Sequence, residues 1–254
     1  FGYFLQYTTD LAILNSDNEL IKKESLRSKS ATKYISQKSL NNYKLFKDHT
    51  EFKINGKDYS IKALLPKEAS YSIQMTLALL DFLKIKPDLS FSKFSLPPGR
   101  CNLFKGIKDT TIIDSSYNAT PDGVKSILGM FTEYPSDKKW IVLGDMIELG
   151  NEEQEEHGRL AEIVNSMKLD KVILVGPRLS KHTYPKLKNA EKFQMPRDAL
   201  GYLLNSLKGR EVILFKGARF LEGIIEHLLL DKNDIKKLCR REKIWQERRK
   251  KWGL

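Results

Sequence analysis

From residue 112 to residue 230 the sequence alternates four short apolar runs with four longer segments of helical periodicity. Strands that alternate with helices form parallel βαβ units with right-handed crossovers, so the helices cover both faces of one sheet. We therefore predict an α/β fold with a mostly parallel sheet. The predicted strands are Ile112–Ile113, Trp140–Leu143, Lys171–Val175 and Glu211–Phe215, and the predicted helices are Pro121–Thr132, Glu152–Met167, Pro196–Leu207 and Phe220–Leu230.

The first hundred residues follow a different pattern. Leu11–Leu14 is a short apolar run that ends in a turn cluster, and Asn55–Gly56 separates two alternating segments, as in a β-hairpin. Ser70–Lys84 predicts a helix, and Pro97–Pro98 marks a hinge between two domains. The apolar residues at helical spacing in that helix are Ile73, Leu77, Leu80 and Leu83.

Composition is that of a globular protein. Hydrophobic residues make up 41% of the 254 residues, and no apolar run approaches the ~18–20 residues of a membrane span. The first residues, Phe1–Leu5, lack a basic region and a cleavage site, so we expect the chain to begin inside a domain. Cys101 and Cys239 lie in different contexts, which indicates reduced thiols and a cytoplasmic protein.

Most of the positive charge lies at the carboxyl end. Residues 236–254 hold nine Lys or Arg and two Glu, which is +7 of the net charge of +12. Leu238, Trp245 and Trp252 follow heptad spacing, so this tail predicts one basic amphipathic helix. We favour a helix that docks through its tryptophans, adds stability and is not needed for chemistry. An anionic partner surface, whether a membrane, RNA or another subunit, is the alternative, although no nucleic acid is expected.

Polar residues gather where the predicted strands end, and ligands bind at such edges in open α/β sheets. Arg100 follows a Pro-Pro-Gly hinge, and its planar guanidinium suits phosphate oxygens as well as a surface ion pair. The block after the first strand leads into a helix that Ser116 or Thr120 can cap. Its candidate ligand-binding residues are Asp114, Tyr117, Asn118 and Asp122.

Two further strand ends carry charged groups. Asp145 and Glu148 lie in a loop closed by glycine, where carboxylates can orient an amine or hold Mg²⁺, and we expect both to face the cleft. His157, on the following helix, is a candidate ligand or a structural histidine. Lys216 and Arg219 at the last strand end would complete a positive rim.

Together these motifs resemble the Mur ligase family. The matching segments are Gly99–Arg100, Asp114–Asp122, Leu143–Gly150 with His157, and Phe215–Arg219, while Ile13–Asp17 resembles an Asn-x-Asp strand end of the family's central domain. The resemblance implies part of a central ATPase domain over residues 1–95, a Rossmann-like ligase domain over 96–232 and a basic helical tail over 233–254.

The implied activity is ATP-dependent amide formation through an acyl phosphate in peptidoglycan precursor synthesis. The implied cofactors are ATP and Mg²⁺, and the implied partners are UDP-N-acetylmuramoyl-tripeptide and D-alanyl-D-alanine. By resemblance, the catalytic residues are Arg100 and Lys216. The nucleotide-binding residues are Asn15, Tyr71, Gln74, Arg100, Asp114, Tyr117 and Asn118, and the substrate-binding residues are Asp122, Asp145, Glu148, His157 and Arg219; no metal ligand is assigned.

The sequence departs from the family in two respects. It has no Gly-x-x-x-x-Gly-Lys-Thr phosphate loop, so we expect a fragment that is inactive alone and lacks the first half of the ATPase domain. Ser70 and Gln74 stand where the family carries a His and an Asn near adenine. Two alternatives remain: an amide ligase of the same superfamily with another amine substrate, and a binding module that has lost catalysis.

Overall fold

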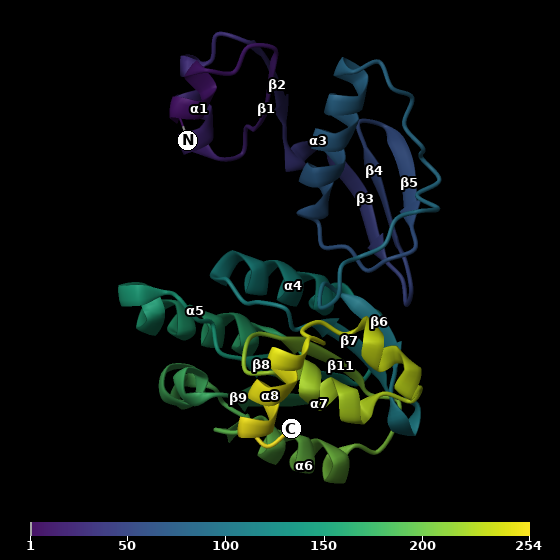
Figure 1. The fold of residues 1–254 in the computed structure, drawn as a ribbon, viewed down its shortest axis with the longest axis vertical. Helices are drawn as coiled ribbons and strands as arrows, with labels where there is room; N and C mark the ends of the chain where they lie inside the picture. Colours follow the sequence, from purple (N-terminus) through teal and green to yellow (C-terminus); the bar gives the residue numbers. More distant parts are fainter. Residues whose placement is uncertain (1) are drawn as a thin grey trace. The chain divides into compact units, whose positions relative to one another are not determined.

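The chain divides into two compact units (Figure 1), Phe1–Phe94 and Ser95–Leu254, which we call unit 1 and unit 2. The structure is a computed structural model that describes residues 2–254. Each unit has its own sheets and helices, so each is described separately. No helix among the described residues combines the length and apolarity that crossing a membrane requires.

Unit 1 contains two small sheets. Strands β1 and β2 pair in parallel, and β3, β4 and β5 form an antiparallel sheet. The β4–β5 hairpin confirms the sequence prediction, with Asn55 and Gly56 at φ 50° and 81° in its turn. Strands β2 and β3 were not predicted because polar residues interrupt their apolar ones. The elements are α1 (Gly2–Gln6), β1 (Leu11–Asn15), α2 (Glu19–Glu24), β2 (Ala31–Ile35), β3 (Leu40–Leu45), β4 (Thr50–Ile54), β5 (Lys57–Ile61) and α3 (Ala69–Phe82).

Helix α3 forms as predicted, but its apolar stripe is not its buried face. The buried residues of α3 are Ser70, Gln74 and Ala78. Leu83, by contrast, is 52% exposed. Gln74 is buried because its amide bonds to the backbone of Ser36, at the end of β2. A polar tertiary contact therefore decides which face of α3 is covered.

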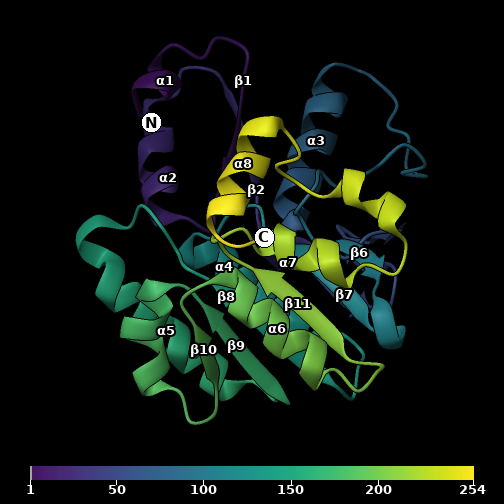
Figure 2. The same cartoon turned by 60° about the horizontal axis from the view of Figure 1, so that its bottom comes forward.

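Unit 2 is built on a six-stranded sheet in the order β10-β9-β8-β11-β7-β6. All neighbouring strands are parallel except β6, which runs antiparallel to β7. Helices α4 and α5 cover one face and α6 and α7 the other (Figure 2), which confirms the predicted α/β fold. The elements are β6 (Asn102–Lys105), β7 (Thr111–Ser115), α4 (Pro121–Glu133), β8 (Lys139–Gly144), α5 (Glu153–Ser166), β9 (Lys171–Val175), β10 (Glu191–Phe193), α6 (Pro196–Ser206), β11 (Val212–Lys216), α7 (Leu221–Leu228) and α8 (Lys243–Lys251).

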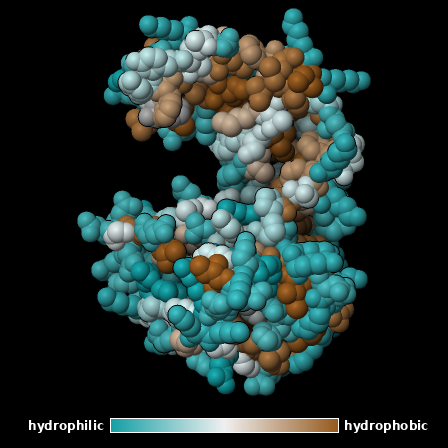
Figure 3. Space-filling view, viewed as in Figure 1, coloured by the Kyte–Doolittle hydropathy of each residue, from teal (hydrophilic) through white to brown (hydrophobic). Residues whose placement is uncertain are grey.

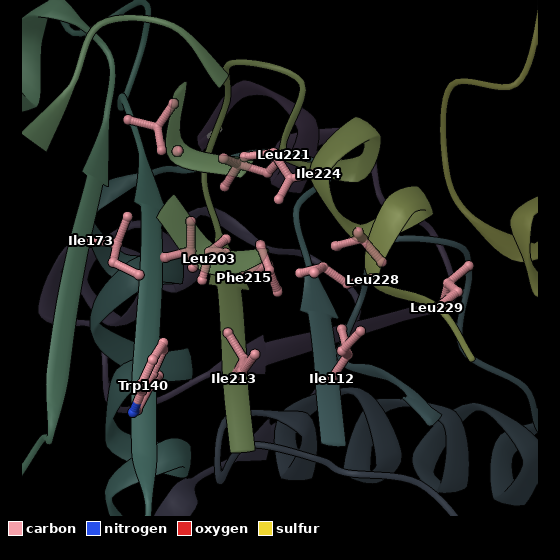
Figure 4. Close-up of a cluster of buried hydrophobic side chains, with 14 of the residues drawn as sticks. Ile112, Trp140, Ile173, Leu203, Ile213, Phe215, Leu221, Ile224, Leu228 and Leu229 are labelled. Atoms are coloured by element: carbon pink, nitrogen blue, oxygen red, sulfur yellow. The ribbon is translucent and has the colours of Figure 1, made fainter. Parts of the chain in front are cut away.

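One hydrophobic core of unit 2 lies between the sheet and helices α6 and α7 (Figure 4). Its side chains come from the middle of the parallel strands and from one face of each helix, and most are fully buried. Close packing on a parallel sheet holds the strand ends in fixed positions. Members of this core are Ile112, Trp140, Ile173, Leu203, Ile213, Phe215, Leu221, Ile224 and Leu228.

The carboxy-terminal segment, residues 231–254, is not the single helix predicted. A 3₁₀ helix over Lys232–Lys237 is followed by an extended link, in which Arg240 has φ 56°, and then by α8. A positive φ at a non-glycine residue ends a helix, and here it follows Leu238, which is buried in the core. Trp245 and Trp252 both lie against Phe220, with ring centroids 6.4 and 6.1 Å away. The carboxy-terminal segment therefore packs on the rest of unit 2.

Candidate functional site

The carboxyl ends of β7, β11 and β8 meet at one edge of the sheet of unit 2. Lys216, the last residue of β11, pairs in register with Ser115 of β7 and Leu143 of β8. The loops that follow approach each other closely: a Cβ on Gly217 would lie 2.3 Å from the carbonyl oxygen of Gly144. Only glycine permits this approach, and Gly217 also has φ 130°. The sheet thus gathers the predicted strand-end residues at a shared edge.

Lys216 and Asp114 are buried at neighbouring positions of this edge. The Nζ of Lys216 donates to the carbonyl oxygen of Asn118 at 2.8 Å. Burial, with a smaller contribution from the charge of Arg100, lowers the pKa of Lys216 to about 8. Burial raises the pKa of Asp114, whose Oδ1 accepts from the amide of Ser116 at 2.9 Å while its Oδ2 has no hydrogen-bond partner among the described residues. An unpartnered buried carboxyl oxygen is unusual and suits a ligand group.

Arg100 lies over the turn that follows β7. Its guanidinium carbon is 4.4 Å from the ring centroid of Tyr117, and the amide of Tyr117 donates to the carbonyl oxygen of Gly99 at 3.2 Å. Arg100 is exposed and forms no ion pair with the described residues. The structure therefore brings Arg100, Tyr117 and Asn118 together beside Lys216, and leaves one guanidinium open to solvent.

Asp145 is not in the exposed position expected from the sequence. Its side chain is fully buried, because Oδ2 accepts from the Nε of Arg219 at 2.8 Å and Oδ1 accepts from the amide of Leu179 at 3.0 Å. Arg178 adds a second ion pair at 3.7 Å. This carboxylate ties the loops after β8, β9 and β11 to one another. The prediction that it faces a cleft overlooked these partners, which lie on distant segments.

The other predicted substrate contacts divide into buried and exposed groups. His157 is fully buried, its Nδ1 donates to the carbonyl oxygen of Glu153 at 2.7 Å, and burial lowers its pKa. This geometry favours the structural interpretation, although its Nε2 has no partner among residues 2–254. Asp122 and Glu148 are exposed. Thr120 caps α4, accepting from Gly123 at 3.3 Å, so the capping prediction is confirmed.

In unit 1, two of the predicted nucleotide-binding residues, Asn15 and Tyr71, bond to Asp17. This exposed carboxylate accepts from Ser36 Oγ at 2.6 Å, from the amide of Gln37 at 2.6 Å and from Tyr71 Oη at 2.8 Å, and these bonds lower its pKa. Asn15 Oδ1 accepts from the amide of Asp17 at 2.9 Å. The predicted base contact by Gln74 is not supported, because its amide group is buried on the backbone of Ser36.

Sequence reasoning missed Arg178 and Arg240. Arg240 donates to the carbonyl oxygens of Ser116 and Tyr117, more than 120 residues away, and no local pattern could have revealed this contact.

Mg²⁺ was expected as a cofactor. The described residues contain no group of three or more His, Cys, Asp or Glu side chains arranged to hold a metal ion.

Comparison with protein families identifies the strand-end motifs. Residues 99–219 match the family described as "Mur ligase, glutamate ligase domain". The matched region begins at the glycine before Arg100 and ends at Arg219, so it contains every candidate residue of unit 2. It includes neither unit 1 nor the carboxy-terminal segment.

Curated relatives extend this similarity into unit 1. The UDP-N-acetylmuramoyl-tripeptide--D-alanyl-D-alanine ligase of Rickettsia prowazekii (strain Madrid E) is 26% identical over 232 residues, which is 83% of this chain and 50% of the relative. The ligase of the same name from Bacillus subtilis (strain 168) is 30% identical over 138 residues, which is 51% of this chain and 30% of the relative. The chain therefore spans half or less of the length of these relatives.

Solved structures show the same fold. The MurF ligase from Thermotoga maritima in complex with ADP matches with a TM-score of 0.76 at 22% sequence identity. The matched region covers 92% of this chain and 56% of the MurF chain. Crystal structure I of MurF from Acinetobacter baumannii matches with a TM-score of 0.72 at 19% sequence identity. The matched region covers 85% of this chain and 50% of the MurF chain. At these identities the likeness concerns the fold alone.

Proposed function

We propose that this chain, whose residues 99–219 match the Mur ligase family, is part of an ATP-dependent ligase of peptidoglycan precursor synthesis. The amine substrate is D-alanyl-D-alanine and the acceptor is UDP-N-acetylmuramoyl-tripeptide. This proposal is supported by the names of the relatives and by the ADP bound to the Thermotoga maritima structure. The cytoplasm, where such precursors would meet ATP, is the proposed location.

One observation carries the proposal for this chain's own residues. Arg100 and Lys216 place two cationic groups near the turn of Tyr117, at the edge where parallel strands end. In the proposed reaction the substrate carboxylate attacks the γ-phosphoryl group of ATP and ADP leaves. The amine of the dipeptide then attacks the acyl carbon, phosphate leaves, and the amine proton passes to solvent. Arg100 and Lys216 would stabilise the charge of the transferring phosphoryl group.

The remaining groups take narrower roles. Asp114, with its unpartnered Oδ2, together with Tyr117 and Asn118, is proposed to contact the nucleotide, as are Asn15 and Tyr71 in unit 1. Exposed Asp122 and Glu148 remain candidates for binding the dipeptide. Buried Asp145 and His157, together with the partly exposed Arg219, would shape the site without touching substrate. Mg²⁺ is a proposed cofactor for which this chain provides no assigned ligand.

The chain itself is proposed to be inactive. It has no Gly-x-x-x-x-Gly-Lys-Thr phosphate loop, and it spans at most half of its relatives. Among residues 2–94, unit 1 pairs only two strands in parallel, although parallel sheets are normally larger and covered on both faces. A further segment of the complete ligase would supply the phosphate loop and finish this domain.

The test uses the complete ligase, supplied with ATP, UDP-N-acetylmuramoyl-tripeptide and D-alanyl-D-alanine. We expect Arg100→Ala to lower kcat by about 100- to 1000-fold while ATP binding changes little, because a guanidinium that meets charge developing during transfer contributes about 3–4 kcal/mol. Arg159→Ala removes an exposed arginine of α5 and is the matched control. A kcat within threefold of wild type would assign Arg100 a structural role.

Two outcomes would favour the alternatives. A complete ligase that uses a single amino acid in place of the dipeptide would belong to another branch of the superfamily. A complete protein that binds the nucleotide without turnover would be a binding module. Separately, ATP turnover by the 254-residue chain alone that Arg100→Ala abolishes would contradict its proposed inactivity.

A further inference from the structure

The turn Ser116–Asn118 is bound on all three of its carbonyl groups by cationic side chains. Arg240 donates from Nη1 to the oxygen of Ser116 at 3.4 Å and from Nη2 to the oxygen of Tyr117. Lys216 donates to the oxygen of Asn118. Arg240 comes from the carboxy-terminal segment, which lies outside the region that matches the family. The conformation of this turn thus depends on a segment that follows the region matched to the family.

Arg240 is itself held in place by a buried charge cluster. Its Nη1 lies 3.3 Å from Oε2 of Glu222, a fully buried residue of α7. Arg249 of α8 lies 3.6 Å from the other carboxylate oxygen and donates to the carbonyl oxygen of Arg240 at 2.7 Å. Buried charges are costly unless paired, so these three side chains have one favourable arrangement. Helix α8 therefore determines where the guanidinium of Arg240 lies.

The same segment reaches the turn through aromatic contacts. The guanidinium carbon of Arg240 lies 5.5 Å from the ring centroid of Tyr117, the ring on which Arg100 also lies. Trp252 covers the guanidinium of Arg219 at 5.4 Å, and Arg219 pairs with Asp145. Cation–π contacts of this kind contribute about 0.5–2 kcal/mol each. Both charged clusters of the strand edge are thus contacted from the carboxy-terminal segment.

We propose that the carboxy-terminal segment is part of the site and that Arg240 is its positioning residue. Arg240 fixes the turn that carries Tyr117 and presents Arg100, so it acts through these residues and not by touching substrate. The inference rests on the proposed function for its catalytic consequence, whereas the geometry of the turn can be measured independently. It differs from the expectation that the basic tail adds stability and is not needed for chemistry.

Arg241 provides a matched control. It is the next residue, its side chain is 21% exposed against 18% for Arg240, and it also ties the segment to α7, through Glu226 at 2.6 Å. It makes no contact with the turn: its other hydrogen bond goes to the carbonyl oxygen of Cys239. A purely structural role for the segment predicts similar effects at both positions, and a positioning role predicts an effect on catalysis at Arg240 alone.

The experiment compares Arg240→Gln and Arg241→Gln in the complete ligase. We expect kcat/KM for ATP to fall at least tenfold in Arg240→Gln and to stay within twofold in Arg241→Gln. Hydrogen–deuterium exchange of residues 115–120 should accelerate in Arg240→Gln and stay unchanged in Arg241→Gln. Arg240→Lys keeps the charge but lacks the fork that reaches two carbonyls, so it should keep the wild-type Tm and recover only part of the activity. This variant decides the question if Arg240→Gln does not fold.

Equal losses in the two glutamine variants, or unchanged exchange at residues 115–120 in folded Arg240→Gln and Arg240→Lys, would overturn the inference. A wild-type complete protein without ligase activity would instead contradict the proposed function. In that case the exchange measurement still decides whether Arg240 holds the turn. The two failures are therefore distinguishable.

Discussion

Unit 1 and unit 2 differ in how completely they cover their apolar residues. Among the described residues, fourteen large hydrophobic side chains of unit 1 are exposed, against five in the larger unit 2. On the face seen in Figure 3, unit 1 carries a broad apolar area, whereas unit 2 shows scattered apolar patches. Large exposed apolar areas mark surfaces that another chain segment or partner covers. Unit 2 can therefore be stable by itself, whereas unit 1 needs another chain segment or a partner to cover its exposed apolar side chains.

The same difference applies to the candidate site residues. In unit 2, Asp114, Asp145 and Lys216 are buried, and their positions follow from packing and pairing. In unit 1, Asp17 is exposed and is held by hydrogen bonds at the surface. Removing a partner from a buried charged group costs much stability, because the remaining charge is left unpaired, whereas water screens the charge of an exposed group. The comparison predicts large effects of substitutions in unit 2 and small ones in unit 1.

The largest expected effect concerns the units when they are separated. Residues 95–254 should unfold in one cooperative transition, because their sheet and helices enclose their own core. Residues 2–94 should show no cooperative transition, because fourteen of their large hydrophobic side chains stay exposed. Thermal unfolding followed by circular dichroism measures both. A sharp transition from residues 2–94 would break the comparison between the units.

Next in size is Asp145→Asn. Removing one partner from a buried ion pair leaves Arg219 uncompensated, so the free energy of unfolding should fall by about 3–5 kcal/mol. Urea denaturation of the chain measures it. Asp122→Asn is the matched control, because Asp122 is exposed in the first turn of α4 and its loss should cost less than about 1 kcal/mol. Similar values for both would show that Asp145 is not buried as described.

The third prediction is a pH dependence from Lys216. Its pKa is about 8 in the folded chain and 10.5 ordinarily, so between these values the unfolded state binds more protons. Its contribution to stability is therefore greatest above pH 10.5 and decreases as the pH falls to 8, by roughly 3 kcal/mol. Lys216→Met should remove this dependence. The buried thiols Cys101 and Cys239, with pKa values of about 11, act in the opposite direction above pH 9.

Only the difference between the wild-type and Lys216→Met curves isolates the lysine, since the thiols are common to both. The measurement is the urea midpoint from pH 7 to pH 10.5. Parallel curves would mean that Lys216 has an ordinary pKa in the folded chain.

The smallest effect is expected for Asp17→Asn in unit 1. Asp17 is exposed, and the polar partners that lower its pKa can bond to water instead. The free energy of unfolding should change by less than about 1 kcal/mol. Denaturation of the chain at pH 7 tests it, alongside Asp145→Asn as the matched substitution in unit 2. A loss as large as that of Asp145→Asn would contradict the division between the two units.

Local sequence patterns predicted the strands and helices of unit 2 with few omissions. Strands β7, β8, β9 and β11 each contain a run of consecutive β-branched or apolar residues, which is typical of buried parallel strands. The omitted β6 and β10 lie at the edges of the sheet, where half-exposed residues carry no clear periodicity. The turn Asn55–Gly56 was predictable because its positive φ angles restrict the residues that fit.

Contacts between distant segments decided the rest. The stripe of Ile73 and Leu77 predicted α3, but the contact between Gln74 and Ser36 determined its buried face. Asp145 was recognisable as a strand-end carboxylate, yet its burial depends on Arg219 and Leu179, which follow other strands. Periodicity is a property of neighbouring residues. Pairing across the sheet is decided only when the whole chain has folded.

By itself, then, the sequence determined the α/β fold and the strand-end motifs that resemble those of the Mur ligase family, because both depend on short-range spacing. The tertiary structure alone decided which of these motif residues are open to a ligand. Arg100 is exposed and Asp145 is enclosed, although both lie in matching motifs. It also brought Arg240 to the turn of Tyr117. A charged side chain is positioned by the partners that neutralise it, and the chain supplies those partners from segments far apart in sequence.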